Sequence, residues 1–451
     1  MILRPHRIPR GLKVLAVSAT VAMVAAACGG SSSSSSSTTT TGSSGGTNQA
    51  SAPGITATTV TLGSHQPLTG PAAPGYSEIA PAASAFFKYV NSKGGVYGRS
   101  IVYNYQDDGY NPANTATVVR KLVLQDNVFA IFNGLGTPTH EAVQSFLNTE
   151  KVPDLFVASG CDCWDNPSQD PYTFGYQTDY TIEGKIQGKY IADHFKGQKV
   201  GYLYQNDDFG QGGVKGLDQE IPSSAVVSRQ TYDATSAGLA NGLGNQITAI
   251  KNAGAQVLVL YTIPVATALS LLAAAGIGWH PTVVVSSVGS DPPTLSGLLS
   301  SISKGKAGGN LEDGVITSSY LPSESDASNP WIALFHQVHD QFDANEPWDG
   351  NTVYGMSVAY TFVQLLRAAG RNPTRQSLVK TLEQDGASFM GPELVPFAFS
   401  TSHHNGALGE QMGTVSGGNF TLSGSIFTTR DPSGTPVSTY SGTQPTPPTS
   451  F

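Results

Sequence analysis

Residues 129–147 read FAIFNGLGTPTHEAVQSFL, an apolar run joined to a helical pattern by a Gly/Thr turn. The run at 129–133 predicts a buried strand, and the apolar spacing within 139–147 predicts an amphipathic helix. A strand that feeds a helix through a short turn is the repeating unit of a parallel α/β sheet. This stretch therefore predicts an α/β fold.

Strand and helix patterns alternate on both sides of this unit. Earlier strands are expected at 60–63 and 101–106, earlier helices at 79–91 and 114–125, and a further strand at 154–157. A second series follows, with strands at 199–204, 226–232, 257–261 and 282–286 and helices at 213–220, 245–253 and 266–275. We expect two successive α/β units that join near 174–179. Helical segments at 330–343 and 353–369 fit best as the chain crossing back to complete the first unit.

The N-terminus has the pattern of an export signal. Basic residues at positions 4, 7, 10 and 13 precede an apolar stretch, 14–27, that is too short to be a comfortable membrane span. Small residues lead directly to Cys28, as in a bacterial lipoprotein signal, although Ala25 stands where a larger aliphatic residue is usual. We expect cleavage after residue 27 and lipidation of Cys28. The alternative is an ordinary secretory signal that is cut beside Cys28.

Composition separates the folded part from its ends. Residues 28–54 are rich in Ser, Thr and Gly and predict a flexible tether, and residues 428–451 predict a disordered tail. Removing residues 1–27 leaves 20 basic and 32 acidic residues, a net charge of 20 − 32 = −12. This charge argues against a nucleic-acid partner and against an electrostatically held membrane face, so we expect membrane contact through the lipid anchor only.

Five short motifs, in order, carry a family resemblance. They are PLTGPAA at 67–73, NSKGGVYG at 91–98, Asp107-Asp108, PDLFVASG at 153–160 and YQNDDFG at 204–210. Together they resemble the branched-chain amino-acid family of ABC-transporter substrate-binding proteins, the periplasmic binding proteins similar to the leucine/isoleucine/valine-binding protein. The resemblance covers most of residues 55–400.

The resemblance implies a Venus-flytrap fold, in which two lobes, each a doubly wound, mainly parallel sheet, are joined by three crossover hinge strands. Carried over, lobe one is 55–176 with 320–397, and lobe two is 177–319 with 398–427. The implied protein is a monomeric solute-binding lipoprotein on the outer face of the bacterial membrane. It binds a small organic molecule, similar to an amino acid, a carboxylate or an amide, by hinge closure and delivers it to an ABC permease.

The resemblance also implies which loops hold the ligand. In lobe one the contact residues are Leu135, Gly136, Thr137 and Thr139 at the helix start, then Ser159, Gly160 and Cys161, with Tyr76 as an aromatic lid. A helix start presents N–H groups and a partial positive charge that suit a carboxylate. The alternatives are that Thr139 only caps the helix, that Gly136 is only a turn, and that Tyr76 is a surface tyrosine.

In lobe two the implied contact residues are Phe209, Thr262, Ile263, Ser286 and Ser287. Family members that bind amino acids place an acidic residue near Ser287 to pair with the ligand's ammonium group. A buried ammonium without a carboxylate is costly, and Asp291, Asp207 and Glu183 do not match that position. We therefore expect a neutral molecule or a carboxylic acid with a modest apolar body.

The remaining motifs favour binding over catalysis. Cys161-Asp162-Cys163 could form a disulfide that stiffens the loop, ligate a soft metal, or be structural cysteines, and we favour the disulfide. The sequence has no nucleophile elbow, phosphate-binding loop or His-Glu-x-x-His motif. We expect no catalytic residue, metal or cofactor. The alternatives are a lipoprotein that senses a ligand and signals to a membrane receptor, and an exported hydrolase.

Overall fold

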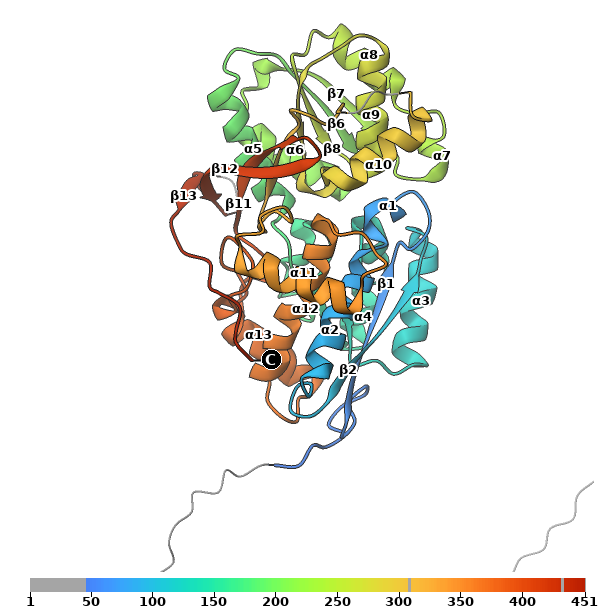
Figure 1. Ribbon diagram of the computed structural model, residues 1–451, viewed down its shortest axis with the longest axis vertical. Helices are drawn as coiled ribbons and strands as arrows, with labels where there is room; N and C mark the ends of the chain where they lie inside the picture. The colour runs from blue at the N-terminus through green and yellow to red at the C-terminus, as the bar shows by residue number, and fades with distance from the viewer. Residues whose placement is uncertain (1–45, 307–309, 431–433, 451) are drawn as a thin grey trace, which may run out of the picture. The chain divides into compact units, whose positions relative to one another are not determined.

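Two separate sheets organise the chain, as the computed structural model shows (Figure 1). The structure describes residues 46–306, 310–430 and 434–450. The first sheet has the order β2-β1-β3-β4-β5, and all its strands are parallel. Its strands are β1 (Thr59–Gln66), β2 (Ser100–Asp107), β3 (Ala130–Phe132), β4 (Asp154–Val157) and β5 (Thr173–Gly175). We call this sheet and the helices packed on it lobe one.

The second sheet has eight strands in the order β13-β12-β11-β10-β9-β8-β6-β7, and with its helices it forms lobe two. β6 (Val200–Gln205), β7 (Val226–Tyr232), β8 (Val257–Tyr261), β9 (Thr282–Val285) and β10 (Ile316–Ser319) are parallel. β11 (Gly409–Ser416), β12 (Asn419–Thr428) and β13 (Ser438–Tyr440) add an antiparallel edge. β8 is buried along its whole length because helices cover both faces of the sheet.

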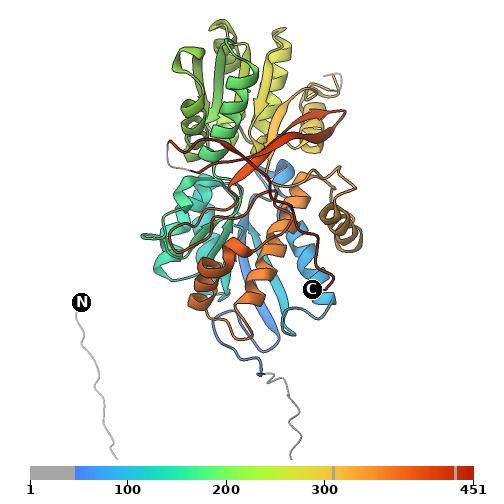
Figure 2. The same ribbon diagram turned by 90° about the vertical axis from the view of Figure 1, so that its left-hand side faces the viewer.

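Helices surround each sheet (Figure 2). Lobe one carries α2 (Ile79–Ser92), α3 (Pro112–Leu124), α4 (Thr137–Thr149), α11 (Pro330–Phe342), α12 (Gly350–Ala368) and α13 (Arg375–Asp385), with the short α1 (Ala73–Tyr76) at its upper edge. Lobe two carries α5 (Tyr180–His194), α6 (Asp208–Glu220), α7 (Ser236–Leu239), α8 (Gly244–Asn252), α9 (Pro264–Gly276) and α10 (Pro292–Ser303).

The chain passes between the lobes three times. It leaves lobe one between β5 and α5, returns between β10 and α11, and leaves again between α13 and β11. The helices α11 and α12 pack against α2, so these late segments complete lobe one. The two-lobed α/β fold expected from the sequence is therefore the fold observed.

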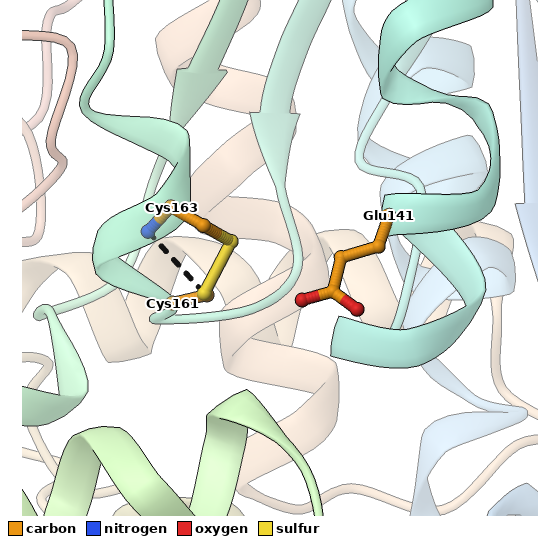
Figure 3. Close-up of side chains that lie close together, drawn as sticks. All are labelled: Glu141, Cys161 and Cys163. Carbon is orange, nitrogen blue, oxygen red and sulfur yellow. Dashed lines mark hydrogen bonds between the residues drawn. A yellow bond between two sulfur atoms is a disulfide. The ribbon is translucent and has the colours of Figure 1, made fainter.

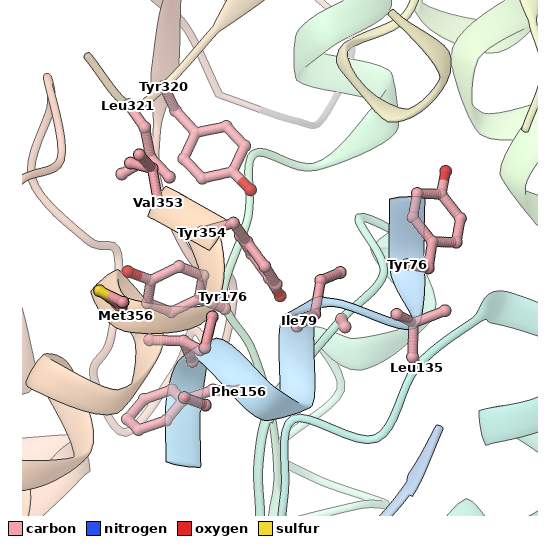
Figure 4. Close-up of a cluster of buried hydrophobic side chains, with 14 of the residues drawn as sticks. Tyr76, Ile79, Leu135, Phe156, Tyr176, Tyr320, Leu321, Val353, Tyr354 and Met356 are labelled. Carbon is pink, nitrogen blue, oxygen red and sulfur yellow. The ribbon is translucent and has the colours of Figure 1, made fainter. Parts of the chain in front are cut away.

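One large apolar core lies around α2, α12 and the first sheet and continues toward the crossing segments. Figure 4 shows part of it, where rings from Phe156, Tyr176 and Tyr354 lie close to Ile79 and the Tyr320-Leu321 segment. Tyr354 belongs to the first turn of α12 and Tyr320 follows β10. The core therefore extends to the level at which the lobes meet.

Two expectations about local structure were wrong. The sequence predicted a helix that begins at residue 213, but α6 begins at Asp208, because Asp207 caps it by accepting a hydrogen bond from the N–H of Phe209 at 3.1 Å. The glycines there are needed for packing, since a Cβ on Gly213 would overlap the ring of Tyr261.

The second correction concerns the C-terminal tail, which was expected to be disordered. Its residues 438–440 form β13, and the indole N–H of Trp331 donates to the carbonyl of Pro445 at 2.6 Å. The tail is therefore held to the fold by the pairing of β13 with β12 and by the hydrogen bond from the buried indole of Trp331. The signal peptide, Cys28 and the tether up to residue 45 lie outside the described residues. Within the described residues, none of the helices is both long and apolar enough to cross a membrane.

Candidate functional site

A cavity of about 150 Å³ lies where the two lobes meet. Its walls come from lobe one, from lobe two and from the crossing segments, including Gln177 and Ser318. A cavity of this size can hold a ligand about as large as a benzene ring or larger. The interlobe cavity is therefore large enough for a small organic molecule.

The lobe-one wall is the turn between β3 and α4, which we call the ligand loop (residues 134–137). Asn133 adopts a left-handed backbone conformation, with φ of 52°, and its side-chain N–H groups donate to Phe156 O at 2.8 Å and Tyr354 Oη at 2.7 Å. Gly136 has φ of 103°, and a Cβ there would lie 2.5 Å from Tyr110 Cε2. The loop therefore bends sharply and needs glycine at position 136.

Two hydroxyl groups join the ligand loop to the end of β4. Thr137 Oγ1 and Ser159 Oγ are 2.7 Å apart and hydrogen-bonded, and both residues are buried. Thr137 is the first residue of α4, a position where a helix leaves backbone N–H groups without an intrahelical partner. This corner can therefore offer hydroxyl and N–H groups to an anionic or carbonyl oxygen of a ligand.

Hydrogen bonds cross directly between the lobes around the cavity. Tyr76 Oη in lobe one donates to Val288 O in lobe two at 2.6 Å. The N–H of Gly350 donates to Asp291 Oδ1 at 2.9 Å, again between lobes. These contacts exist only when the lobes are together, so the structure shows the closed arrangement.

The charge on the cavity wall is one-sided. Among the described residues that line the cavity none is Lys or Arg, whereas Asp291 and Glu324 are acidic. Burial raises the pKa of Asp291 to about 7, and its two oxygens already accept hydrogen bonds from Thr294 and Gly350. Asp291 is therefore occupied in holding the closed arrangement.

Glu183 lies behind the opposite wall. Its Oε1 accepts a hydrogen bond from the N–H of Ser287 at 2.5 Å, and burial raises its pKa to about 7. Asp207 is the N-cap of α6 and accepts from Gln205 at 2.6 Å. Neither carboxylate lines the cavity beside Ser287.

The structure brings part of the predicted contact set onto the cavity wall. Tyr76, Leu135, Gly136, Thr137, Phe209, Ile263 and Ser287 line it. Ser159, Gly160 and Cys161 instead line a small adjoining pocket that shares Gln177 with the cavity. These two groups come from both lobes and from six segments that are far apart in sequence.

Three predicted contact residues are not on the wall, and the hydroxyl of each has an internal role. Thr139 Oγ1 donates to Leu135 O at 2.6 Å. Thr262 Oγ1 is hydrogen-bonded to Thr267 Oγ1 at 2.6 Å, and Ser286 Oγ accepts from the N–H of Val288 at 3.2 Å. They shape the loops from behind, because a nearby residue lines the cavity in each case: Thr137, Ile263 and Ser287.

Four tyrosines on the wall were missed by the sequence analysis. They are Tyr110, Tyr180, Tyr320 and Tyr354. Each lies near the start of a helix or just past a strand. Tyr180, Tyr320 and Tyr354 come from crossing segments or from α12, where the sequence shows no strand-turn-helix pattern that marks a contact loop. The sequence offered a signal only for Tyr110 and Tyr354, which lie just after the strand predicted at 101–106 and in the first turn of the helix predicted at 353–369. No element was predicted beside Tyr180 or Tyr320.

Cys161 and Cys163 are joined by a disulfide in the loop after β4 (Figure 3). The carboxylate of Glu141 on α4 lies beside them, and ligand atoms of the three residues are within 4.8 Å of one another. Because the sulfur atoms are bonded to each other, only one carboxylate remains as a hard ligand. The disulfide therefore serves to close the loop beside Ser159.

Comparisons with known proteins agree with this geometry. A family model described as periplasmic binding protein matches residues 59–417. Leu/Ile/Val-binding protein homolog 2 of Brucella abortus (strain 2308) is 30% identical over 166 residues, which is 35% of this chain and 42% of that protein. The aligned part thus spans about two fifths of the length of that relative.

Solved structures show the same fold at low identity. A branched chain amino acid ABC transporter structure from Thermus thermophilus, with bound valine, has a TM-score of 0.70 at 20% identity and covers 82% of this chain and 96% of its own. A fatty acid ABC transporter substrate-binding protein from Thermomonospora curvata has a TM-score of 0.71 at 21% identity, covering 82% and 92%.

An interlobe cavity in a pair of α/β lobes is suited to holding a ligand. The chain belongs to the periplasmic binding protein family. Proteins of this family that share its fold are substrate-binding proteins and not enzymes.

Proposed function

We propose that this protein is the extracytoplasmic solute-binding component of an ABC importer and is held at the outer face of the bacterial membrane by a lipid on Cys28. The observation that carries the proposal is the interlobe cavity, whose walls come from both lobes and from the crossing segments. Binding there favours the closed arrangement, because a ligand adds contacts that the open form lacks.

The proposed ligand is a small neutral molecule or a carboxylic acid with an apolar body. Tyrosine rings and Leu135, Phe209 and Ile263 supply apolar surface, while Thr137 and the start of α4 supply donors. A carboxylate at this corner does not require a cationic side chain, since N–H groups at a helix start carry partial positive charge. An ammonium group next to Ser287 lacks a free carboxylate at that position.

The direct test is a thermal-shift screen of the mature protein with carboxylic acids, amides and amino acids, L-leucine and L-valine included. A ligand that binds only the folded state raises the melting temperature. At a concentration 100 times its Kd, it adds about 2.7 kcal/mol to the free energy of unfolding. Isothermal titration then gives the affinity of each hit. A screen without any shift contradicts the proposed binding function.

The membrane anchor is tested separately. Cells that express the full chain should retain it in the membrane fraction, and Cys28→Ser should release it, because the thiol is the proposed lipid attachment point. Metabolic labelling with a fatty acid should mark only the wild-type chain. Equal labelling of both chains contradicts lipidation at Cys28.

A further inference from the structure

A continuous chain of four buried side chains runs beneath the ligand loop. Asp108 Oδ2 is 2.8 Å from His65 Nδ1, His65 Nε2 is 2.9 Å from His140 Nδ1, and His140 Nε2 is 2.8 Å from Asp154 Oδ2. His65 and His140 are 0% exposed, as is Asp154, and Asp108 is 1% exposed. None of these four residues lines the cavity. We call them the carboxylate–histidine chain.

The three links fix the number of protons in the chain. Each hydrogen bond needs one proton between its two atoms. Two ionised aspartates and two neutral imidazoles provide only two protons for three contacts. Depending on the tautomers, either two bare nitrogens would face each other at 2.9 Å or a bare nitrogen would face a carboxylate oxygen at 2.8 Å. The geometry therefore requires a third proton, shared in the pair His65–His140, and a net charge of −1 for the chain.

A fourth proton does not fit. It would put hydrogens on both His65 Nε2 and His140 Nδ1, so that two N–H groups would point at each other across the same contact. Burial and the neighbouring His140 lower the pKa of His65, and the hydrogen bond to Asp108 opposes them. Burial therefore disfavours positive charge on the pair, and a second positive charge more than the first.

The carboxylate–histidine chain touches the ligand loop directly. The N–H of Leu135 donates to His65 O at 3.3 Å, and His140 lies in the first turn of α4. A Cβ on Gly134 would lie 2.5 Å from His65 Nε2 and 2.6 Å from His140 Nδ1, so the loop rests on the contact between the two rings.

The carboxylates connect the chain to other parts of lobe one. Asp108 Oδ1 accepts from the N–H of Tyr110, a residue of the cavity wall, at 2.8 Å, and Asp108 Oδ2 accepts from Thr115 Oγ1 at 2.8 Å. Asp154 Oδ2 accepts from Thr173 Oγ1 on β5 at 2.9 Å. Charges that act on His65 come from His140, Asp108 and Asp154. Beyond these, Asp170 interacts with Asp154, and Tyr110 with Asp108.

We propose that His65 and His140 are positioning residues for the ligand loop, which hold it through one shared proton and release it when the pair takes up a second. The role in ligand binding rests on the proposed function, but the proton count does not. We expect the ligand loop to be released at a pH below the ordinary pKa of histidine, since the buried pair resists a further proton. A purely structural histidine pair would hold the same shared proton but would show no pH-dependent opening of the ligand loop.

The first test is nitrogen NMR of the full mature chain labelled with ¹⁵N-histidine. At pH 7.5 the four ring nitrogens of His65 and His140 should carry three protons, and at pH 5 four. Two protons at pH 7.5, meaning two neutral rings, overturn the proposal. Assignment uses the single variants His65→Gln and His140→Gln.

The second test is hydrogen exchange at the amides of Leu135 and Gly136, corrected for the intrinsic pH dependence of exchange. In the wild-type chain, lowering the pH from 7.5 to 5 should increase local opening at least tenfold. Asp154→Asn keeps the shape but removes one charge that retains the shared proton, so the loop should already open at least tenfold more at pH 7.5. Exposed His280 provides the matched control, and His280→Gln should behave like wild type. Loop opening that is unchanged by pH overturns the proposal.

Titrations with 2-hydroxy-4-methylpentanoate, a carboxylic acid with an apolar body that stays ionised at pH 5, separate the two proposals. Affinity for this acid that falls at pH 5 in wild type, and at both pH values in Asp154→Asn, supports the coupling of the carboxylate–histidine chain to binding. If the NMR and exchange results hold but the titrations detect no binding of the acid at either pH, the positioning role stands and the proposed binding of a carboxylic acid fails. If the acid binds equally at both pH values while the loop opens, the coupling to ligand binding is wrong.

Discussion

At the scale of single residues, Gly136 and Gly94 form a matched pair. Both have φ of 103°, but a Cβ on Gly136 meets Thr139 and Tyr110, whereas one on Gly94 meets nothing within 4 Å. Gly136→Ala and Gly94→Ala should each lose about 1–2 kcal/mol of stability through backbone strain. Only Gly136→Ala should also weaken ligand binding, by at least tenfold in isothermal titration. Equal affinities for the two variants would move the site away from the ligand loop.

Tyr76 has one hydroxyl contact that depends on closure. Tyr76→Phe removes the hydrogen bond to Val288 O and leaves the ring on the cavity wall. A lost hydrogen bond of about 1 kcal/mol predicts roughly fivefold weaker ligand binding without a comparable loss of fold stability. Tyr97→Phe is the control, because Tyr97 donates to Arg367 O within lobe one. Matching affinities of Tyr76→Phe and wild type would contradict a role for this contact in closure.

Glu393 makes stability depend on pH. Burial raises its pKa to about 7 from an ordinary value of 4.5, although the Tyr176 hydroxyl donates to Oε1 at 2.5 Å. The folded state therefore favours the protonated form, so this contribution is complete below pH 4.5 and is lost as the pH rises through about 7. Glu393→Gln should flatten the fall in stability between pH 5 and 8, by up to about 3 kcal/mol at the alkaline end. If the free energy of unfolding, measured with urea, falls equally with pH in both proteins across this range, the assignment is refuted.

At the scale of elements, the C-terminal strand β13 is the feature that composition misjudged. Removing residues 434–451 deletes β13 and leaves the buried indole N–H of Trp331 without its acceptor, Pro445 O. We expect a loss of about 2 kcal/mol and a lower melting temperature, with ligand affinity retained. Removing only residues 446–451 spares these contacts and serves as the control. Identical melting temperatures for the two truncations would mean that the tail contributes nothing.

The elements themselves follow from local patterns. β4 and β7 begin and end where the sequence predicted, because short apolar or β-branched runs between turn signals are decided by neighbouring residues. α6 starts earlier than predicted, since the glycines at 210–213 pack against Gln205 and Tyr261 rather than forming a turn. The local sequence could not reveal these packing partners, because Gln205 and Tyr261 lie on strands of the sheet that α6 covers.

At the scale of the whole molecule, closure is a measurable change of shape. Two hydrogen bonds, Tyr76–Val288 and Gly350–Asp291, join the lobes. Without a ligand, water competes for these groups, so we expect the unliganded protein to open. Saturating ligand from the thermal-shift screen should reduce the radius of gyration in solution scattering, and Tyr76→Phe should start from a larger value. An unchanged radius at saturation would argue against hinge closure.

The sequence by itself determined the α/β alternation, because hydrophobic periodicity and turn signals act over a few residues. The family resemblance, rather than these patterns, predicted the order of the contact loops and the neighbourhood of Thr137. Only the tertiary structure decided that Thr137 faces the cavity while Thr139 turns back to Leu135. It also decided that His65 meets His140, a contact between residues 75 positions apart. Such contacts depend on how strands are placed in the sheet, and strand placement is set by the burial of the whole core.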